Sequence, residues 1–137
     1  MKILSLAFLM IVFMSACKKD TPETINNENE FLVLTDQTFE SEVKNGAGVA
    51  FVLFHAEWCS ACKQVIPDVE EAVVFGSLSE VTFGEIDHVD FPDVFTNEGI
   101  SGFPKLVIYK DGVQQEIMSQ GSQATAEDIR DALLPYL

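Results

Sequence analysis

Two cysteines separated by two residues are the side chains of this 137-residue chain best suited to chemistry. Cys59 and Cys62 follow a strongly apolar segment and open a segment with helical periodicity. At a helix N-terminus, free backbone N–H groups and the helix dipole favour a thiolate, which is the attacking species in disulfide exchange. The spacing therefore predicts that Cys59 attacks a disulfide and that Cys62, one turn deeper and less exposed, resolves the mixed disulfide.

The same pair admits three other interpretations. A zinc site usually needs four ligands, and besides carboxylates only His55 and His88 remain as candidates. A purely structural disulfide that closes so small a loop contributes only about 2 kcal/mol. The third interpretation is a coincidental pair of buried thiols. We favour a redox-active Cys59–Cys62 disulfide, which requires no metal and no separate cofactor.

A buried strand and a long helix must position these cysteines. Val49–His55 is apolar on both alternating faces, which is typical of a central strand in an α/β sheet. From Cys59 to about Phe75 apolar residues recur at helical spacing, and Pro67 within this stretch predicts a kink. The expected core residues of this helix are Val65, Ile66, Val69, Val73 and Val74.

The other segments of the folded part also alternate between strands and helices. The predicted strands are Phe31–Leu34, Val81–Ile86, Lys105–Tyr109 and Val113–Met118, with a tight turn at Asp111-Gly112 between the last two. The predicted helices are Gln37–Lys44 capped by Asp36, Phe91–Glu98, and Ala126–Leu137 capped by Thr125. This alternation predicts an α/β domain with a mixed sheet.

The N-terminal residues have the pattern of a secretory signal rather than of a folded element. Lys2 precedes an apolar run, Ile3–Ala16, which is shorter than the roughly 20 residues of a spanning helix. An N-terminal anchor helix is the alternative. Residues 18–30 are polar apart from Ile25, so we expect a flexible tether that reaches at most about 45 Å.

Met14-Ser15-Ala16-Cys17 resembles the lipobox of bacterial lipoproteins, in which small residues precede a lipidated cysteine. The resemblance implies that residues 1–16 are a signal peptide and that residues 17–30 are a lipidated cysteine and its tether. Lipid on Cys17 would anchor the chain in the bacterial cell envelope, on the periplasmic or extracytoplasmic face of a membrane. An ordinary free or disulfide-bonded thiol is the alternative for Cys17.

The charge balance excludes two classes of partner. The chain has 22 acidic and 8 basic residues and a formal charge of −14. Binding to nucleic acid requires a basic face, and docking on anionic lipid through charge requires a polybasic patch. Residues 31–137 alone hold 18 acidic and 5 basic side chains, so the acidity belongs to the domain and predicts salt-sensitive repulsion of acidic client proteins.

From about residue 31 to residue 137 the chain resembles thioredoxin and related thiol–disulfide oxidoreductases. The match rests on the segment FHAEWC at 54–59, Pro67 in the helix, the loop GISGFP at 99–104, the turn at 110–112, and Gly121. The order and spacing of these features agree. The resemblance implies a thioredoxin fold, with a mixed central sheet of four to five strands flanked by helices on both faces.

The resemblance also implies roles for the residues that surround the cysteines. Pro104 would follow a cis peptide bond, leaving the backbone of Phe103 to pair with an extended substrate segment. Trp58 would form an apolar rim beside Cys59. The alternatives are a trans Pro104 that begins a strand and a Trp58 that fills the core. We expect a monomer that acts on protein disulfides or dithiols and needs a redox partner to recycle the pair.

Two departures from the thioredoxin pattern bear on mechanism. Ser60-Ala61 replaces the Gly-Pro dipeptide between the cysteines, which leaves reductase, oxidase and isomerase activity all open. Leu53 and Phe83 stand where thioredoxin has a buried acid and its lysine partner. We hypothesise that Glu57, His55 or water takes over proton transfer, and that His55 in its charged form lowers the thiol pKa. The alternative is a purely packing role for His55.

Two functions of different class are consistent with these observations. The first is a membrane-anchored thiol–disulfide oxidoreductase that uses Cys59 and Cys62. The alternative is a binding module with the same fold and no redox turnover. His88 lies in an acidic loop, Asp87–Asp90, and is expected to be solvated.

Overall fold

The structure, a computed structural model, describes residues 30–137. The predicted signal peptide, the predicted lipidation site Cys17 and the tether up to residue 29 lie outside the described residues. In the described part of the chain no helix is long and apolar enough to cross a membrane.

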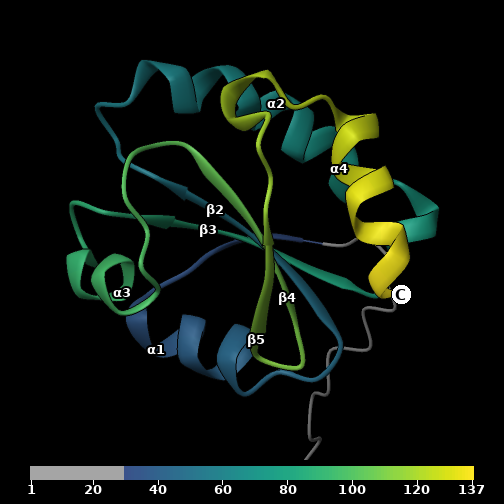
Figure 1. Cartoon of the computed structure of the whole chain (residues 1–137), viewed down its shortest axis with the longest axis horizontal. Coiled ribbons are helices and arrows are strands. Elements are labelled where there is room, and N and C mark those ends of the chain that lie inside the picture. Colours follow the sequence, from purple (N-terminus) through teal and green to yellow (C-terminus); the bar gives the residue numbers. More distant parts are fainter. Residues whose placement is uncertain (1–29) are drawn as a thin grey trace, which may run out of the picture.

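A five-stranded mixed sheet forms the centre of the domain (Figure 1). The strands are β1 (Phe31–Val33), β2 (Val49–His55), β3 (Val81–Asp87), β4 (Lys105–Lys110) and β5 (Val113–Ile117), in the order β1-β3-β2-β4-β5. β1, β3 and β2 are parallel, whereas β4 and β5 are antiparallel to their neighbours. The observed fold class and the mixed sheet agree with the prediction.

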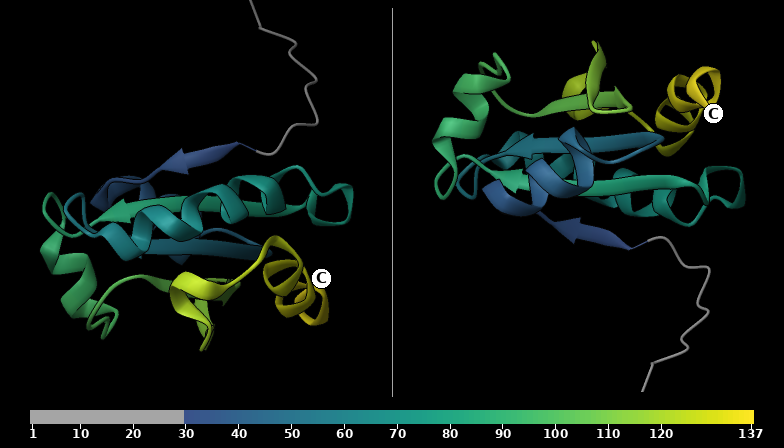
Figure 2. Two further views of the ribbon diagram at one scale, coloured as in Figure 1. Left: turned by 90° about the horizontal axis from the view of Figure 1, so that it is seen from above. Right: turned by 90° about the horizontal axis from the view of Figure 1, so that it is seen from below.

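Helices cover both faces of the sheet (Figure 2). They are α1 (Asp36–Thr38), which continues as a π-helical segment over Phe39–Lys44, α2 (Ser60–Val73), α3 (Pro92–Asn97) and α4 (Ala126–Leu133). Side chains of α2 and α4 pack in one core with one face of the sheet, and side chains of α1, its π-helical continuation and α3 pack in a second core with the other face. Both cores meet on β2, whose residues Val49 to Phe54 are all buried.

The structure corrects the predicted helix ends. Thr35, not Asp36, caps the first helix, because its hydroxyl accepts the N–H of Thr38 while the hydroxyl of Thr38 accepts the N–H of Thr35. α2 ends at Val73, so Val74 is 71% exposed and is not a core residue. The last α-helix ends at Leu133 and gives way to a 3-10 turn over Leu134–Tyr136, which contains Pro135.

A buried tyrosine ties β4 to α3 and to the end of the first helix. Tyr109 is fully buried and its hydroxyl donates to a carboxylate oxygen of Glu98 over 3.0 Å. Lys44 forms an ion pair with the same carboxylate at 3.0 Å. Burial, and then the charge and hydrogen bond of Glu98, raise the pKa of Tyr109 far above its usual range.

Tyr109 should make the domain sensitive to alkali. Its folded-state pKa is raised, so protonated Tyr109 contributes its full stabilisation below the unfolded pKa of about 10. Above that pH the free energy of unfolding should fall by up to about 1.4 kcal/mol per pH unit. Tyr109→Phe should remove this decline between pH 10 and 12 in urea titrations. Tyr136→Phe is the matched control, and an equal effect of both substitutions would contradict the assignment.

Candidate redox site

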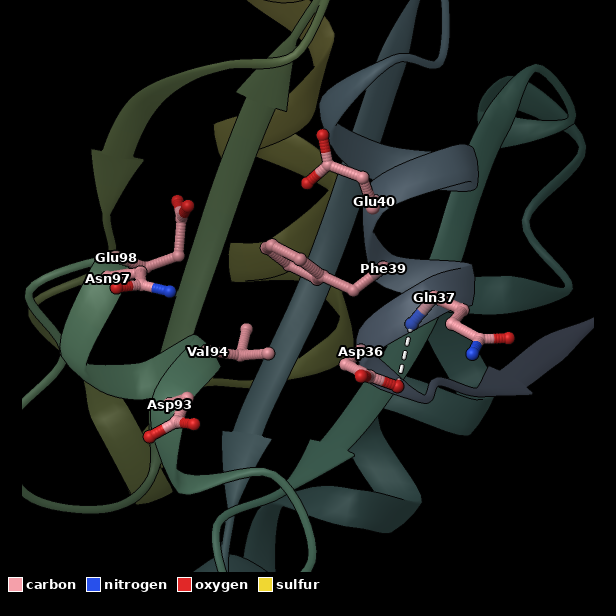
Figure 3. A pocket seen from close by; sticks show the side chains of 8 residues that line it. All are labelled: Asp36, Gln37, Phe39, Glu40, Asp93, Val94, Asn97 and Glu98. Atoms are coloured by element: carbon pink, nitrogen blue, oxygen red, sulfur yellow. Dashed lines mark hydrogen bonds between the residues drawn. The ribbon is translucent and has the colours of Figure 1, made fainter.

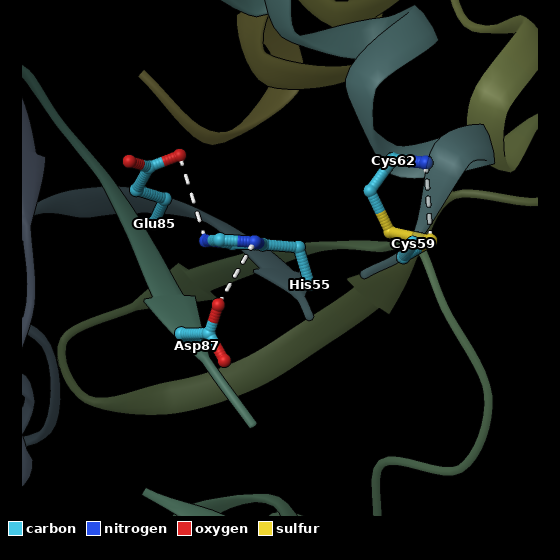
Figure 4. Close-up of a disulfide and its surroundings, with 5 residues drawn as sticks. All are labelled: His55, Cys59, Cys62, Glu85 and Asp87. Carbon is cyan, nitrogen blue, oxygen red and sulfur yellow. Dashed lines mark hydrogen bonds and ion pairs between the residues drawn. A yellow bond between two sulfur atoms is a disulfide. The ribbon is translucent and has the colours of Figure 1, made fainter. Parts of the chain in front are cut away.

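Cys59 and Cys62 form a disulfide at the start of α2 (Figure 4). Their Cα atoms lie 5.3 Å apart. Cys59 is the N-cap residue of α2 in extended backbone conformation, and its sulfur accepts the backbone N–H of Cys62 over 3.1 Å. Cys59 is 7% exposed and Cys62 is 1% exposed. A thiolate on Cys59, the more exposed of the two residues, would therefore be stabilised by a helix N-terminal donor.

A short turn brings Cys59 from the end of β2 to the start of α2. Ala56 is buried directly after the strand, and its carbonyl accepts the N–H of Cys59 over 2.9 Å. The two residues inside this turn, Glu57 and Trp58, are exposed. The turn therefore places Trp58 on the surface directly beside the nucleophile.

The residues of the predicted substrate groove lie together around the disulfide. The Phe103–Pro104 peptide bond is cis, as the resemblance implied. Phe103 is half-buried and packs against the cluster formed by Ala56, Cys59 and Cys62. The ring of Trp58 lies edge-on to that of Phe103, with centroids 5.7 Å apart, and Trp58 is 69% exposed. Trp58 is thus part of the rim and does not fill the core.

The imidazole of His55 is held by two carboxylates on the neighbouring strand. Its ring nitrogens lie 3.6 Å from a carboxylate oxygen of Glu85 and 3.7 Å from one of Asp87. Leu53 and His55 are in register with Glu85 and Asp87 on the parallel strand β3, which places all four side chains on one face of the sheet. Figure 4 shows the imidazole pointing toward β3 and away from the disulfide.

The interior beneath the site contains no charge. Leu53 and Phe83 are both fully buried in the core under α2, and the ring of Phe83 lies 5.5 Å from that of Phe51. Among residues 30–137 no charged residue is buried. The other candidate for proton transfer, Glu57, is exposed, and its carboxylate has no partner within the described chain.

His88 is a residue of this region that sequence reasoning missed. It is half-buried, and its ring centroid lies 5.0 Å from that of Phe95 and 5.1 Å from that of Phe103. The expectation of a solvated side chain was wrong, because the acidic loop around His88 folds against α3 and against the loop before β4. Its ring partners lie in α3 and in the loop before β4, so the residue pattern of the acidic loop itself contained no signal for these contacts.

A pocket lies between the first helix and α3, apart from all predicted site residues. It has a volume of about 580 Å³ and is lined by four acidic side chains together with Phe39, Val94, Gln37 and Asn97 (Figure 3). One of the acids, Glu98, is already bound to Tyr109 and Lys44. Within residues 30–137 no group of three His, Cys, Asp or Glu side chains is arranged to hold a metal ion.

Comparison with known proteins identifies the family. A family model described as Thioredoxin matches residues 30–134. A thioredoxin of Acetoanaerobium sticklandii is 31% identical over 105 residues, which are 76% of this chain and 97% of that protein. A thioredoxin of Rhodospirillum rubrum is 38% identical over 80 residues, which are 58% of this chain and 75% of that protein.

Longer proteins and solved structures match as well. Protein disulfide isomerase-like 5-3 of Oryza sativa is 27% identical over 114 residues, which are 81% of this chain but only 27% of that protein. The crystal structure of Malassezia sympodialis thioredoxin superimposes with a TM-score of 0.69 at 22% identity, covering 79% of this chain and 91% of that chain, and shows the same fold. With the disulfide at the start of α2, these matches establish that the chain belongs to the thioredoxin family and is a thiol–disulfide oxidoreductase.

Proposed function

We propose that this protein is a membrane-anchored thiol–disulfide oxidoreductase that exchanges disulfides with proteins at the extracytoplasmic face of the bacterial cell envelope. The observation that carries the proposal is the disulfide at the N-terminus of α2, in which residue Cys59 is slightly more exposed than residue Cys62, together with the cis Phe103–Pro104 bond. Cys59 is the attacking residue and Cys62 the resolving residue. The lipid on Cys17 supplies the anchor.

The exchange runs through a mixed disulfide and balances without a cofactor. The Cys59 thiolate attacks one sulfur of a substrate disulfide, and the other substrate sulfur leaves as a thiolate. The Cys62 thiolate then attacks the sulfur of Cys59 and releases the second substrate thiolate. The substrate gains two electrons, the pair becomes the observed disulfide, and the reverse sequence oxidises a substrate dithiol. A redox partner must return the pair to its starting state.

Protein disulfides are the substrates on which the thioredoxin family generally acts. Here Trp58, Phe103 and Pro104 form the groove, and the backbone of Phe103 pairs with an extended substrate segment. The aromatic rim binds apolar side chains that flank the substrate cysteine.

His55 and Glu57 stay candidates for proton transfer, since Leu53 leaves no acid beneath Cys62. Substitution at Leu53 tests this part of the proposal. We propose that the protein acts as a monomer.

The anchor has a direct chemical test. The mature protein should lack residues 1–16 and should carry acyl chains on Cys17, because several chains are needed for a firm hold on a membrane. Intact-mass analysis of protein purified from membranes should show both changes, and metabolic labelling with a fatty acid should mark the chain.

Substitution at the cysteines gives the matched controls for this test. Cys17→Ala should abolish labelling, whereas Cys59→Ser should keep it. A wild-type protein that retains Met1, or that starts at an unmodified Cys17, would contradict the lipoprotein assignment and favour an anchor helix or an ordinary thiol.

A further inference from the structure

Phe103 stands at the centre of an aromatic cluster beside the disulfide. Its ring contacts three other rings, those of Trp58 at 5.7 Å, His88 at 5.1 Å and Phe95 at 5.5 Å between centroids. Trp58 lies outermost and is mostly exposed, whereas Phe95 is 1% exposed and packs edge-on against Phe54 in the core. Phe103 therefore links the surface rim to the rigid interior.

Both the backbone and the ring of His88 have partners in the fold. Its N–H donates to the carbonyl of His55 at the end of β2 over 2.9 Å. Its imidazole lies perpendicular to the ring of Phe95, with the ring centroids 5.0 Å apart. The contact with Phe103 is thus one of ring against ring, and the backbone of the loop is anchored independently of the side chain.

We propose that His88 is a positioning residue for substrate binding. Its ring holds Phe103 in the orientation that contacts Trp58 and presents the Phe103 backbone to the substrate. The inference rests on the proposed use of this groove for protein substrates. It predicts an effect on binding rather than on chemistry, because the ring contacts of His88 are with Phe95 and Phe103 and not with a reacting sulfur.

Three substitutions separate the shape of the ring from its polarity. His88→Ala removes both, His88→Gln keeps a polar side chain without a ring, and His88→Phe keeps a ring without polar atoms. Val89→Ala is the matched control, since Val89 is an exposed neighbour in the same loop and has no ring contact. Retained folding of each variant is checked by its urea midpoint.

The kinetic assay is reduction of a quenched fluorescent peptide disulfide with saturating dithiothreitol as the recycling thiol. His88→Ala and His88→Gln should raise KM by about three- to ten-fold, which is the size of effect that loss of one or two aromatic pairs produces. Their kcat should stay within about two-fold of wild type, as should the reduction potential of the pair. His88→Phe and Val89→Ala should match wild type.

A spectroscopic readout tests the positioning itself. Trp58 is the only tryptophan of the chain, so its emission reports the arrangement of the rim. The emission of the oxidised protein should change in His88→Ala and His88→Gln but not in His88→Phe or Val89→Ala.

Each result bears on the proposal. An unchanged KM in His88→Ala, a fall in kcat alone, or failure of phenylalanine to restore wild-type behaviour would overturn it. Should the wild-type protein show no turnover at all, the proposed function fails, and the emission of Trp58 still decides whether His88 positions the rim.

Discussion

Cys59→Ser should lower the rate of disulfide exchange by at least about 10³-fold, because a serine hydroxyl is not ionised near neutral pH and cannot form the mixed disulfide. Fold and stability of the reduced protein should change little, since Cys59 is a small residue at the start of α2. The assay is turnover of a peptide disulfide with dithiothreitol, measured beside wild type and corrected for the direct reaction of the reductant.

Cys62→Ser should behave differently, because it keeps the nucleophile and removes the resolving thiol. Its Cys59 should accumulate as mixed disulfides with client proteins in cell envelopes. Non-reducing gels should show adducts that dithiothreitol releases, and mass spectrometry of the released proteins would identify the clients.

The double variant Cys59→Ser/Cys62→Ser is the control for adducts formed elsewhere in the chain. Equal adducts in the double variant, or adducts that form in Cys59→Ser but not in Cys62→Ser, would reverse or reject the assigned roles. Absence of both adducts and turnover would instead favour a binding module.

Local sequence patterns were enough to predict the elements that carry the redox pair. A short run that is apolar on both faces is typical of a strand in a sheet covered on both sides, and this is what β2 is. The cysteines fall where the helical spacing of apolar residues begins, and this spacing predicted their place at the start of α2. The cis bond before Pro104, by contrast, was predicted from family resemblance and not from local physics.

Contacts between distant segments could not be predicted in this way. Glu85 approaches His55 because β2 and β3 are parallel and in a particular register, which no periodicity within either strand specifies. His88 meets Phe103 only after the loop, α3 and the segment before β4 have packed together. Thr35 and Asp36 are both good caps by residue type, and only the backbone conformation of the first turn decides between them.

Leu53 stands where thioredoxin has a buried acid, and restoring that acid with Leu53→Asp should have a large effect on stability. Leu53 is fully buried and packs in the core under α2 with Phe83 and other apolar side chains. Leu53→Asp would put a carboxyl group into this apolar core, opposite Glu85 on β3 and without a basic partner in register. We expect a loss of about 3–5 kcal/mol in the free energy of unfolding, from lost packing and unpaired burial together.

The same variant tests how the resolving cysteine loses its proton. If Glu57, His55 or water already accepts this proton, then Leu53→Asp should leave the rate of mixed-disulfide resolution unchanged within about two-fold. The rate is measured in single turnover at a temperature where the variant is folded. An acceleration of about ten-fold or more would show that an internal base had been missing, and would remove the surface groups from that role.

The loss of unfolding free energy in Leu53→Asp should depend on pH, and this dependence distinguishes a buried charge from a simple packing defect. Burial without a partner raises the folded-state pKa of a carboxyl group above its unfolded value of about 3.9. The destabilisation by Leu53→Asp should therefore grow as the pH rises above about 4, by up to about 1.4 kcal/mol per unit, until the folded-state pKa is reached.

Leu53→Asn, which has similar shape and no charge, should lose stability equally at pH 4, 6 and 8. Adding Phe83→Lys to Leu53→Asp should recover part of the loss at pH 8, because it supplies the partner that thioredoxin has at this position. A Leu53→Asp protein that is no less stable at pH 8 than at pH 4 would mean that water or a polar group reaches this position, and that the apolar pair is not what keeps charge out of the interior beneath Cys62.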